Sequence, residues 1–138
     1  MEELEPQSQH IARELRHEFP GVDAYFSQEK GVLKVTWPSQ NPAVTEDFVL
    51  DCKDIPSLYW FKGYMFDFFG YSTEEEQATE IRRFIRDFFA ERIGCALWLE
   101  GEKVHGGGPA WFESDGPDSF WKQPGYTIRS WRGTRDLG

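Results

Sequence analysis

Apolar residues recur at helical spacing in two segments of the chain. Over residues 74–93 they form one continuous stripe, made of Ala78, Ile81, Phe84, Ile85, Phe88, Phe89 and Ile93. A capping box precedes the stripe, because Thr73 can cap the first turn and Glu76 can reach back to it. We therefore predict a long helix over about 74–93, ended by Gly94. Ile11, Leu15 and Phe19 predict an N-terminal helix over about 7–19.

In most of the remaining chain, apolar and polar residues alternate or short runs are apolar, and both patterns are typical of strands. Residues 22–27 and 32–37 are predicted to form a hairpin, and the aromatic run 58–69 one long strand with a bulge at Gly63. Gly106 to Pro109 is interpreted as an interruption between short strands. The other predicted strands are Val44–Cys52, Cys95–Leu99, Lys103–His105, Ala110–Phe112 and Tyr126–Trp131.

These elements predict an α+β fold in a single domain over residues 1–138. An antiparallel sheet, with its strands mostly in sequence order, is packed on one face by the 74–93 helix. The N-terminal helix lies beside the sheet or across one of its edges. The tail 133–138 is expected to be loose.

The composition is acidic and rich in aromatic residues. The chain has a net charge of −9 and is 17% aromatic, with twelve Phe, six Trp and five Tyr. A small core cannot bury this many aromatic rings. Some are therefore expected at the surface, where aromatic residues are enriched at protein interfaces. The acidic charge argues against nucleic acid and anionic membranes as partners. Residues 1–80 carry 16 acidic and 6 basic residues, so this half can steer a basic protein partner.

The two cysteines indicate a reducing compartment, since two are too few for a disulfide framework. The acidic N-terminus does not resemble a signal peptide, and no apolar run is long enough to span a membrane. We therefore expect a cytoplasmic protein that carries no cofactor.

The stretch His105-Gly106-Gly107-Gly108 matches the oxyanion-hole motif of lipases and esterases. That chemistry also needs a nucleophile elbow of the form G-x-S-x-G, and Gly70 to Glu74 lacks its second glycine. A flexible loop is the simpler interpretation of the three glycines. Phosphate binding is a second alternative, but no Lys-Ser or Lys-Thr pair follows them.

Two other groups of residues have the chemistry of a metal site or of a catalytic pair. His10, Glu14 and His17 share one helical face, but a solvated face explains them without a metal ion. Carboxylates near tryptophans suggest sugar hydrolysis, but their spacing selects no catalytic pair. The sequence therefore assigns neither catalytic residues nor a metal site.

Acidic and aromatic residues alternate between positions 46 and 67, which is typical of a surface that binds a basic partner. Charge sets the rate and orientation of such binding, whereas buried rings provide affinity. The alternative is that the rings fill the core and the acids solvate the other face. The candidate partner-binding residues are Glu46, Asp47, Asp51, Asp54, Tyr59, Trp60 and Asp67.

Taken whole, the chain resembles the bacterial immunity proteins that accompany polymorphic or contact-dependent toxins. The resemblance covers its size, acidity, aromatic content and arrangement of strands around one helix, and involves no specific motif. It implies a protein-binding module that neutralises a toxin by covering its active site. The surface from Glu46 to Asp67 would then cover a basic cleft, such as that of a nuclease toxin.

Two other functions are consistent with the sequence. The first is a small-molecule or carbohydrate-binding domain, or an enzyme, that uses Trp98, Trp111 and Trp121. It predicts a concave pocket lined by these rings, whereas the immunity function predicts a flat or protruding acidic face. The second is a homo-oligomeric structural protein with a large apolar patch. The oligomeric state stays open at this point.

Overall fold

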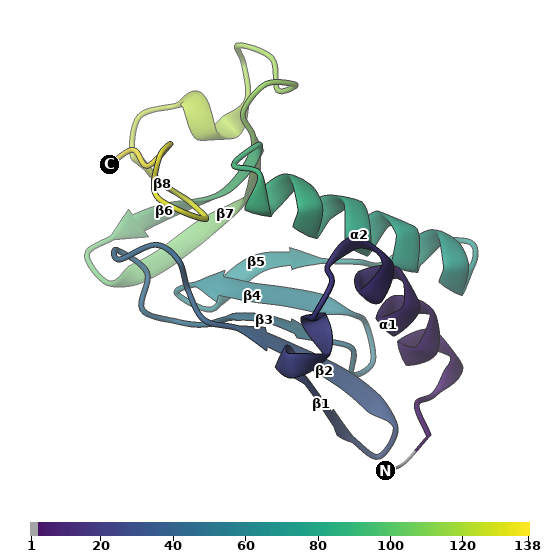
Figure 1. Cartoon of the computed structure of the whole chain (residues 1–138). Helices are drawn as coiled ribbons and strands as arrows, with labels where there is room; N and C mark the ends of the chain where they lie inside the picture. Colours follow the sequence, from purple (N-terminus) through teal and green to yellow (C-terminus); the bar gives the residue numbers. More distant parts are fainter. Residues whose placement is uncertain (1–2) are drawn as a thin grey trace.

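The computed structural model describes residues 3–138, which form two α-helices and two antiparallel sheets (Figure 1). The larger sheet has the order β1–β2–β3–β4–β5 and the smaller one β7–β6–β8. The predicted α+β fold is confirmed, although the strands divide between two sheets instead of one. The strands are β1 (Phe26–Glu29), β2 (Val32–Trp37), β3 (Phe48–Asp51), β4 (Ser57–Phe61), β5 (Tyr64–Asp67), β6 (Ile93–Glu100), β7 (Lys103–Trp111) and β8 (Tyr126–Ser130).

Helices α1 (Pro6–Glu18) and α2 (Glu74–Phe89) pack against each other on one side of the larger sheet (Figure 1). Their apolar stripes face the sheet because apolar surface is stabilised when it is removed from water. On the outer side, Arg82 of α2 joins the two helices. Its Nε lies 3.0 Å from Glu14 Oε2, and its Nη1 lies 3.2 Å from Glu18 Oε1.

The start of α2 follows the prediction and its end does not. Thr73 Oγ1 accepts a hydrogen bond of 3.0 Å from the backbone N–H of Glu76, as expected for a cap. The helix ends at Phe89, before the predicted residue 93. Glu91 takes a positive φ of 63°, and the chain then enters β6 at Ile93. Gly94 is therefore part of a strand and does not end the helix.

Two predicted strands differ in the structure. The run 58–69 reverses at Lys62 and Gly63, whose φ angles are 51° and 79°, and so forms β4 and β5 rather than one strand. Residues Val22–Tyr25 form a short 3₁₀ helix, η1, and β1 begins only at Phe26. Gly63 was the local signal of the turn between β4 and β5, and interpreting it as a bulge was wrong.

The glycines 106–108 lie within β7, so their interpretation as an interruption or loop was wrong. Each is paired with a residue of β6: Gly106 with Trp98, Gly107 with Leu97 and Gly108 with Ala96. At Gly107 an added Cβ would lie 2.2 Å from Ala96 O, so only glycine fits this position without moving the backbone. Glycine is disfavoured in strands by propensity, but close packing at this position requires it.

A cluster of aromatic rings joins the smaller sheet to the main core. Trp131, just after β8, is buried and lies 4.8 Å from Phe89 and 5.4 Å from Phe88 of α2, measured between ring centroids. It also lies 5.6 Å from Phe48 and 5.9 Å from Trp60 of the larger sheet. The main core therefore takes side chains from both sheets.

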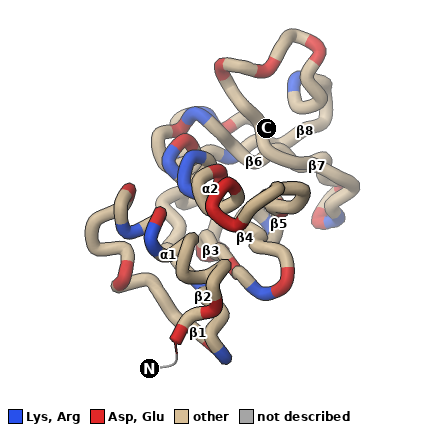
Figure 2. Tube along the Cα trace, turned by 90° about the vertical axis from the view of Figure 1, so that its right-hand side faces the viewer, with Lys and Arg blue, Asp and Glu red and all other residues tan. Residues whose placement is uncertain are grey.

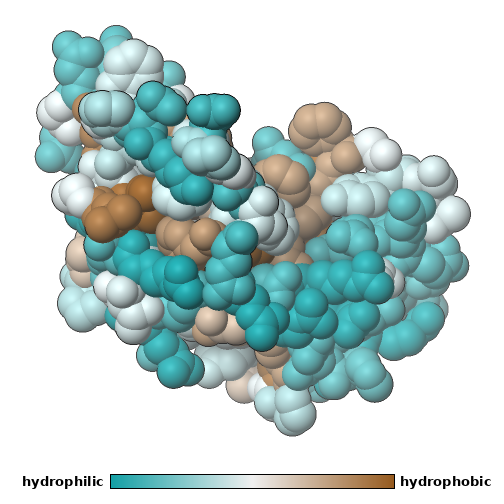
Figure 3. All heavy atoms as spheres, turned by 90° about the horizontal axis from the view of Figure 1, so that it is seen from above, coloured by the Kyte–Doolittle hydropathy of each residue, from teal (hydrophilic) through white to brown (hydrophobic). Residues whose placement is uncertain are grey.

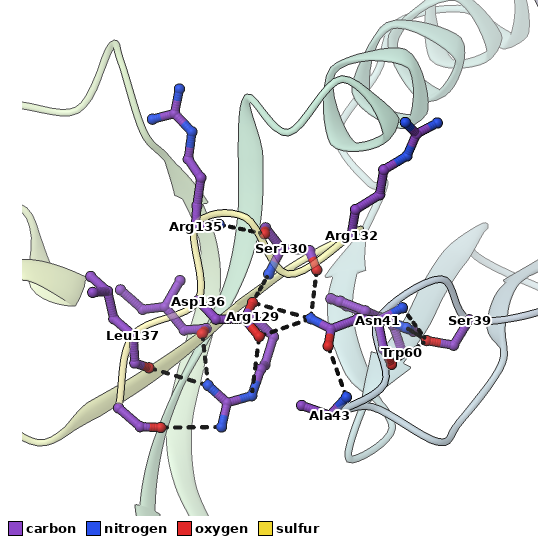
Figure 4. Close-up of polar contacts among 12 residues, drawn as sticks. Ser39, Asn41, Ala43, Trp60, Arg129, Ser130, Arg132, Arg135, Asp136 and Leu137 are labelled. Carbon is purple, nitrogen blue, oxygen red and sulfur yellow. Dashed lines mark hydrogen bonds and ion pairs between the residues drawn. The ribbon is translucent and has the colours of Figure 1, made fainter.

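Asn41, in the loop between β2 and β3, connects this loop to the C-terminal tail (Figure 4). Its Nδ2 donates to Ser130 O at 2.8 Å and to the carboxylate of Asp136, and its Oδ1 accepts from the Ala43 N–H at 2.8 Å. Leu137 pairs with Ile128 of β8. The sequence suggested a loose tail over 133–138, whereas these contacts hold it against the protein.

Candidate functional site

The predicted acidic surface lies partly on the face of the larger sheet that the helices leave uncovered. The strand register places Asp51 beside Ser57 and Ser57 beside Asp67, so both carboxylates belong to one row across the sheet. Tyr59 lies on the same face and is 43% exposed. Lys34 is the register partner of Asp51, so part of the negative charge in this row is compensated.

The other acids of the predicted set lie at the edges of this face. Glu46 and Asp47 are exposed in the loop that precedes β3, and Asp54 is exposed in the turn between β3 and β4. They therefore do not form one compact patch with Asp51 and Asp67.

Trp60 was wrongly included among the surface residues. It is fully buried, and its ring centroid lies 4.9 Å from that of Phe88 of α2. Side chains alternate along a strand, so Tyr59 and Trp60 point to opposite sides of β4. Its indole N–H donates to Ser39 Oγ at 3.2 Å (Figure 4), which satisfies its polar group inside the protein.

A groove of about 520 Å³ lies between β5 and β7. We call it the β5–β7 groove and define it by Tyr59, Tyr64, Asp67, Phe69, Gly107 and Pro109. Three of its aromatic rings reach solvent: Tyr59 is 43% exposed, Tyr64 51% and Phe69 69%. Exposed rings gathered in this way are typical of interaction sites. Figure 3, a view from above, shows apolar side chains at the surface in the central hollow and in a group projecting at the upper right.

The groove carries negative charge at one end. Asp67 supplies this charge. Glu74, Glu75 and Glu76 are exposed at the start of α2 and do not line the groove. Figure 2 shows these acidic positions at the end of α2 that faces the viewer. At the other end, Lys62 Nζ lies 3.0 Å from Glu102 Oε2, so the nearby basic charge is paired.

The sequence identified Tyr59 and Asp67 of this groove, and the candidate surface between Glu46 and Asp67 includes Tyr64, but Phe69 and the residues of β7 were missed. Tyr64 and Phe69 belong to an apolar run whose exposed positions become clear only with the turn at Lys62 and Gly63. The part of β7 in the groove is distant in sequence, and only the tertiary fold brings it to β5.

A larger hollow of about 780 Å³ lies between α1 and β1. Arg16 and Asp23 are paired within it, because Arg16 Nε lies 2.7 Å from Asp23 Oδ1, and the guanidinium also lies over the ring of Phe26. Phe26 and Leu33 of this hollow are half-buried or buried. We therefore place the candidate site in the β5–β7 groove, where exposed rings and the carboxylate of Asp67 occur together.

The three tryptophans of the alternative function do not line a common pocket. Only Trp98 is exposed, at 51%. Trp111 packs against Phe84 of α2 with a centroid distance of 5.5 Å. Trp121 is buried in a second small cluster that contains Ala96 and Ala110, and its indole N–H donates to Asp115. The prediction of one concave pocket lined by these three rings is therefore wrong.

The candidate histidines are also separate from one another. His105 Nε2 lies 2.9 Å from Glu100 Oε2, and His10 Nε2 lies 3.6 Å from Glu75 Oε1. Within residues 3–138, no group of three His, Cys, Asp or Glu side chains is placed to hold a metal ion.

Both cysteines are buried and reduced. Burial raises the pKa of the Cys95 thiol from 9.0 to about 12, and burial together with the charge of Asp51 raises the pKa of Cys52 to about 12. Cys95 Sγ donates to Tyr64 O at 3.5 Å, directly behind the groove. A thiol that keeps its proton is a poor nucleophile, so neither cysteine provides a reactive group at neutral pH.

Alkaline pH is expected to destabilise the fold through these thiols. Above pH 9 the unfolded chain loses its thiol protons, whereas the folded chain keeps them up to about pH 12, so stability falls across this window. Urea unfolding at several pH values should show a smaller fall in the double variant Cys52→Ala and Cys95→Ala. Tyrosines and lysines titrate in both proteins, so the difference isolates the thiols. If the free energy of unfolding fell equally with pH in the two proteins, the thiols would not be responsible.

Comparison with protein-family models, curated proteins and solved structures gives no match. In the described residues, neither helix has the length and apolarity needed to cross a membrane.

Proposed function

We propose that this chain is a protein-binding module of the immunity type, which neutralises a basic toxin by covering its active site. The observation that carries the proposal is the β5–β7 groove, which is lined by three exposed rings and the acidic side chain of Asp67. Aromatic residues dominate the binding energy of many protein interfaces, and peripheral acids orient a basic partner and speed its association.

The chemistry of the groove favours binding over catalysis. The groove holds one carboxylate, the aromatic rings and glycine backbone, and the nearby thiol keeps its proton. The three-glycine motif lies within β7, where each glycine is a register partner of a residue of β6.

Affinity capture from the source cell, with mass spectrometry of the retained proteins, tests the proposal. The expected result is one basic protein retained in stoichiometric amount and released by salt. Failure to retain such a protein contradicts the proposed function. In that case a glycan array becomes the next test, since Trp98 is half exposed beside Tyr126 and could stack a sugar ring.

The groove residues are expected to provide most of the affinity for the captured partner. Tyr64→Ala and Phe69→Ala should each weaken binding by about 2 kcal/mol, or roughly 30-fold, because exposed rings at the centre of an interface contribute this much. Tyr25→Ala is the matched control, since Tyr25 is 41% exposed near the opposite edge of the larger sheet. Biolayer interferometry with the captured protein measures all three. Equal effects of Tyr25→Ala and Tyr64→Ala would place the interface elsewhere.

A further inference from the structure

Strand β7 is one of the two edge strands of the smaller sheet, so within residues 3–138 its outer edge has no strand partner, although β5 packs near it. It spans Lys103–Trp111, which is long for an edge strand. Edge strands are usually short or protected by charge, proline or a bulge, since a bare edge can pair with another chain. Pro109 and a register shift opposite Trp98 and Leu99 protect parts of β7, whereas residues 106–108 carry no side chains.

Packing explains only one of these three glycines. Gly107 is required because an added Cβ would collide with Ala96 O. At Gly106 an added Cβ would meet nothing within 4 Å, and at Gly108 it would only touch Phe120 at 3.8 Å. Internal contacts therefore leave space at Gly106 and Gly108. Glycine in a strand often marks a bulge or a site that another backbone approaches closely. The register shift explains Gly106, whereas Gly108 lies beyond it, paired with Ala96.

The β5–β7 groove borders the same strand at Gly107, Gly108 and Pro109. Side chains of an added strand would alternate between its two faces. One set would enter the groove, which Tyr64 and Asp67 also line, and the other would face away from it. The carboxylate of Asp67 makes this groove suitable for a lysine or arginine side chain, whose stem packs on the rings while its charge meets the carboxylate.

We propose that the partner contributes an extended basic segment that pairs with β7 between Lys103 and Gly108 and adds a fourth strand to the smaller sheet. This inference rests on the proposed function and names the form of the partner's contact. Main-chain hydrogen bonds hold the segment, and alternate side chains in the groove select it. A second copy of this chain is disfavoured as occupant because each copy carries a net charge of −9.

The first test titrates the ¹⁵N-labelled protein with the peptide acetyl-KVKVKV-amide. We expect chemical shifts in β7 and at Tyr64 and Asp67, with amide exchange in residues 103–108 slowed about tenfold in the saturated complex. Amides of β1, an edge strand of the larger sheet, serve as the internal control and should not change. Shifts at β1 alone, or none at saturating peptide, would overturn the proposal.

A backbone control separates strand pairing from charge attraction. The same peptide with N-methyl groups on alternate residues keeps its side chains and loses donors on one edge, so its affinity should fall at least about tenfold. Asp67→Asn should weaken binding of the unmethylated peptide about threefold and reduce its salt dependence, whereas the exposed Asp118→Asn should not. Equal affinity of both peptides would exclude strand addition. Concentration-dependent shifts of β7 without peptide would indicate a second copy and also overturn it.

These outcomes are distinct from failure of the proposed function. If Tyr64→Ala and Phe69→Ala abolish binding of the captured partner while exchange at residues 103–108 stays unchanged in that complex, the protein-binding function stands and strand addition is wrong. If exchange at these residues slows in the partner complex by about tenfold, as with the peptide, the segment is a strand of the partner.

Discussion

Replacing Gly107 with alanine is expected to destabilise the protein by at least about 3 kcal/mol, a large part of the stability of a small domain. The added Cβ would lie 2.2 Å from Ala96 O and 3.0 Å from the Cα of Leu97. Both are backbone atoms of the neighbouring strand β6, so a side-chain rotation cannot relieve the collision. The smaller sheet would have to separate at the pair formed by Leu97 and Gly107.

The control is Gly106→Ala, one residue earlier in the same strand, where the added Cβ meets no atom within 4 Å. Urea unfolding followed by circular dichroism measures both variants. We expect Gly106→Ala to remain within about 0.5 kcal/mol of the parent protein, as is usual for open surface positions. Similar losses in both variants would show that strand propensity, rather than the collision, accounts for the effect.

Trp131→Ala is expected to cost about 4 kcal/mol, because it removes a large buried ring and leaves a cavity. The ring lies between Phe89 of α2, Phe48 of β3 and Trp60 of β4, although it follows a strand of the smaller sheet. The loss should therefore affect the contact between the two sheets.

Trp98→Ala is the matched control, since Trp98 is 51% exposed and its removal should cost less than about 1 kcal/mol. Unfolding followed by both far-UV circular dichroism and Trp fluorescence gives the free energies and tests whether the two transitions coincide. A cost below about 1 kcal/mol for Trp131→Ala would show that the sheets are stabilised independently of this ring.

The helices could be predicted because their signals are local. The Thr73 cap and the apolar stripe of α2 depend on residues within four positions of each other. The end of α2 could not, because Ile93 fits the helical stripe and also the buried strand β6. The choice depends on the pairing of β6 with both β7 and β8, which is a tertiary effect.

The candidate site shows the same limit. Tyr59 and Asp67 could be proposed from their alternation with other residues and from charge. The sequence does not show which face of a strand is exposed, and Trp60, which points to the buried face, was wrongly assigned to the surface. The division into two sheets depends on a strand that contains three consecutive glycines, and local propensity disfavours such a strand. The β7 wall of the groove could therefore not be found before the fold was known.

The buried thiols have a practical consequence for spectroscopy. Cys52 and Cys95 are the only cysteines, and both are shielded from solvent and hold their protons at neutral pH. Maleimide dyes, which react with accessible thiolates, should leave the native chain unlabelled. A cysteine introduced at an exposed position such as Ser114 would then carry a fluorophore at one defined point. Distances from that dye to a labelled partner could be measured without first removing the natural cysteines.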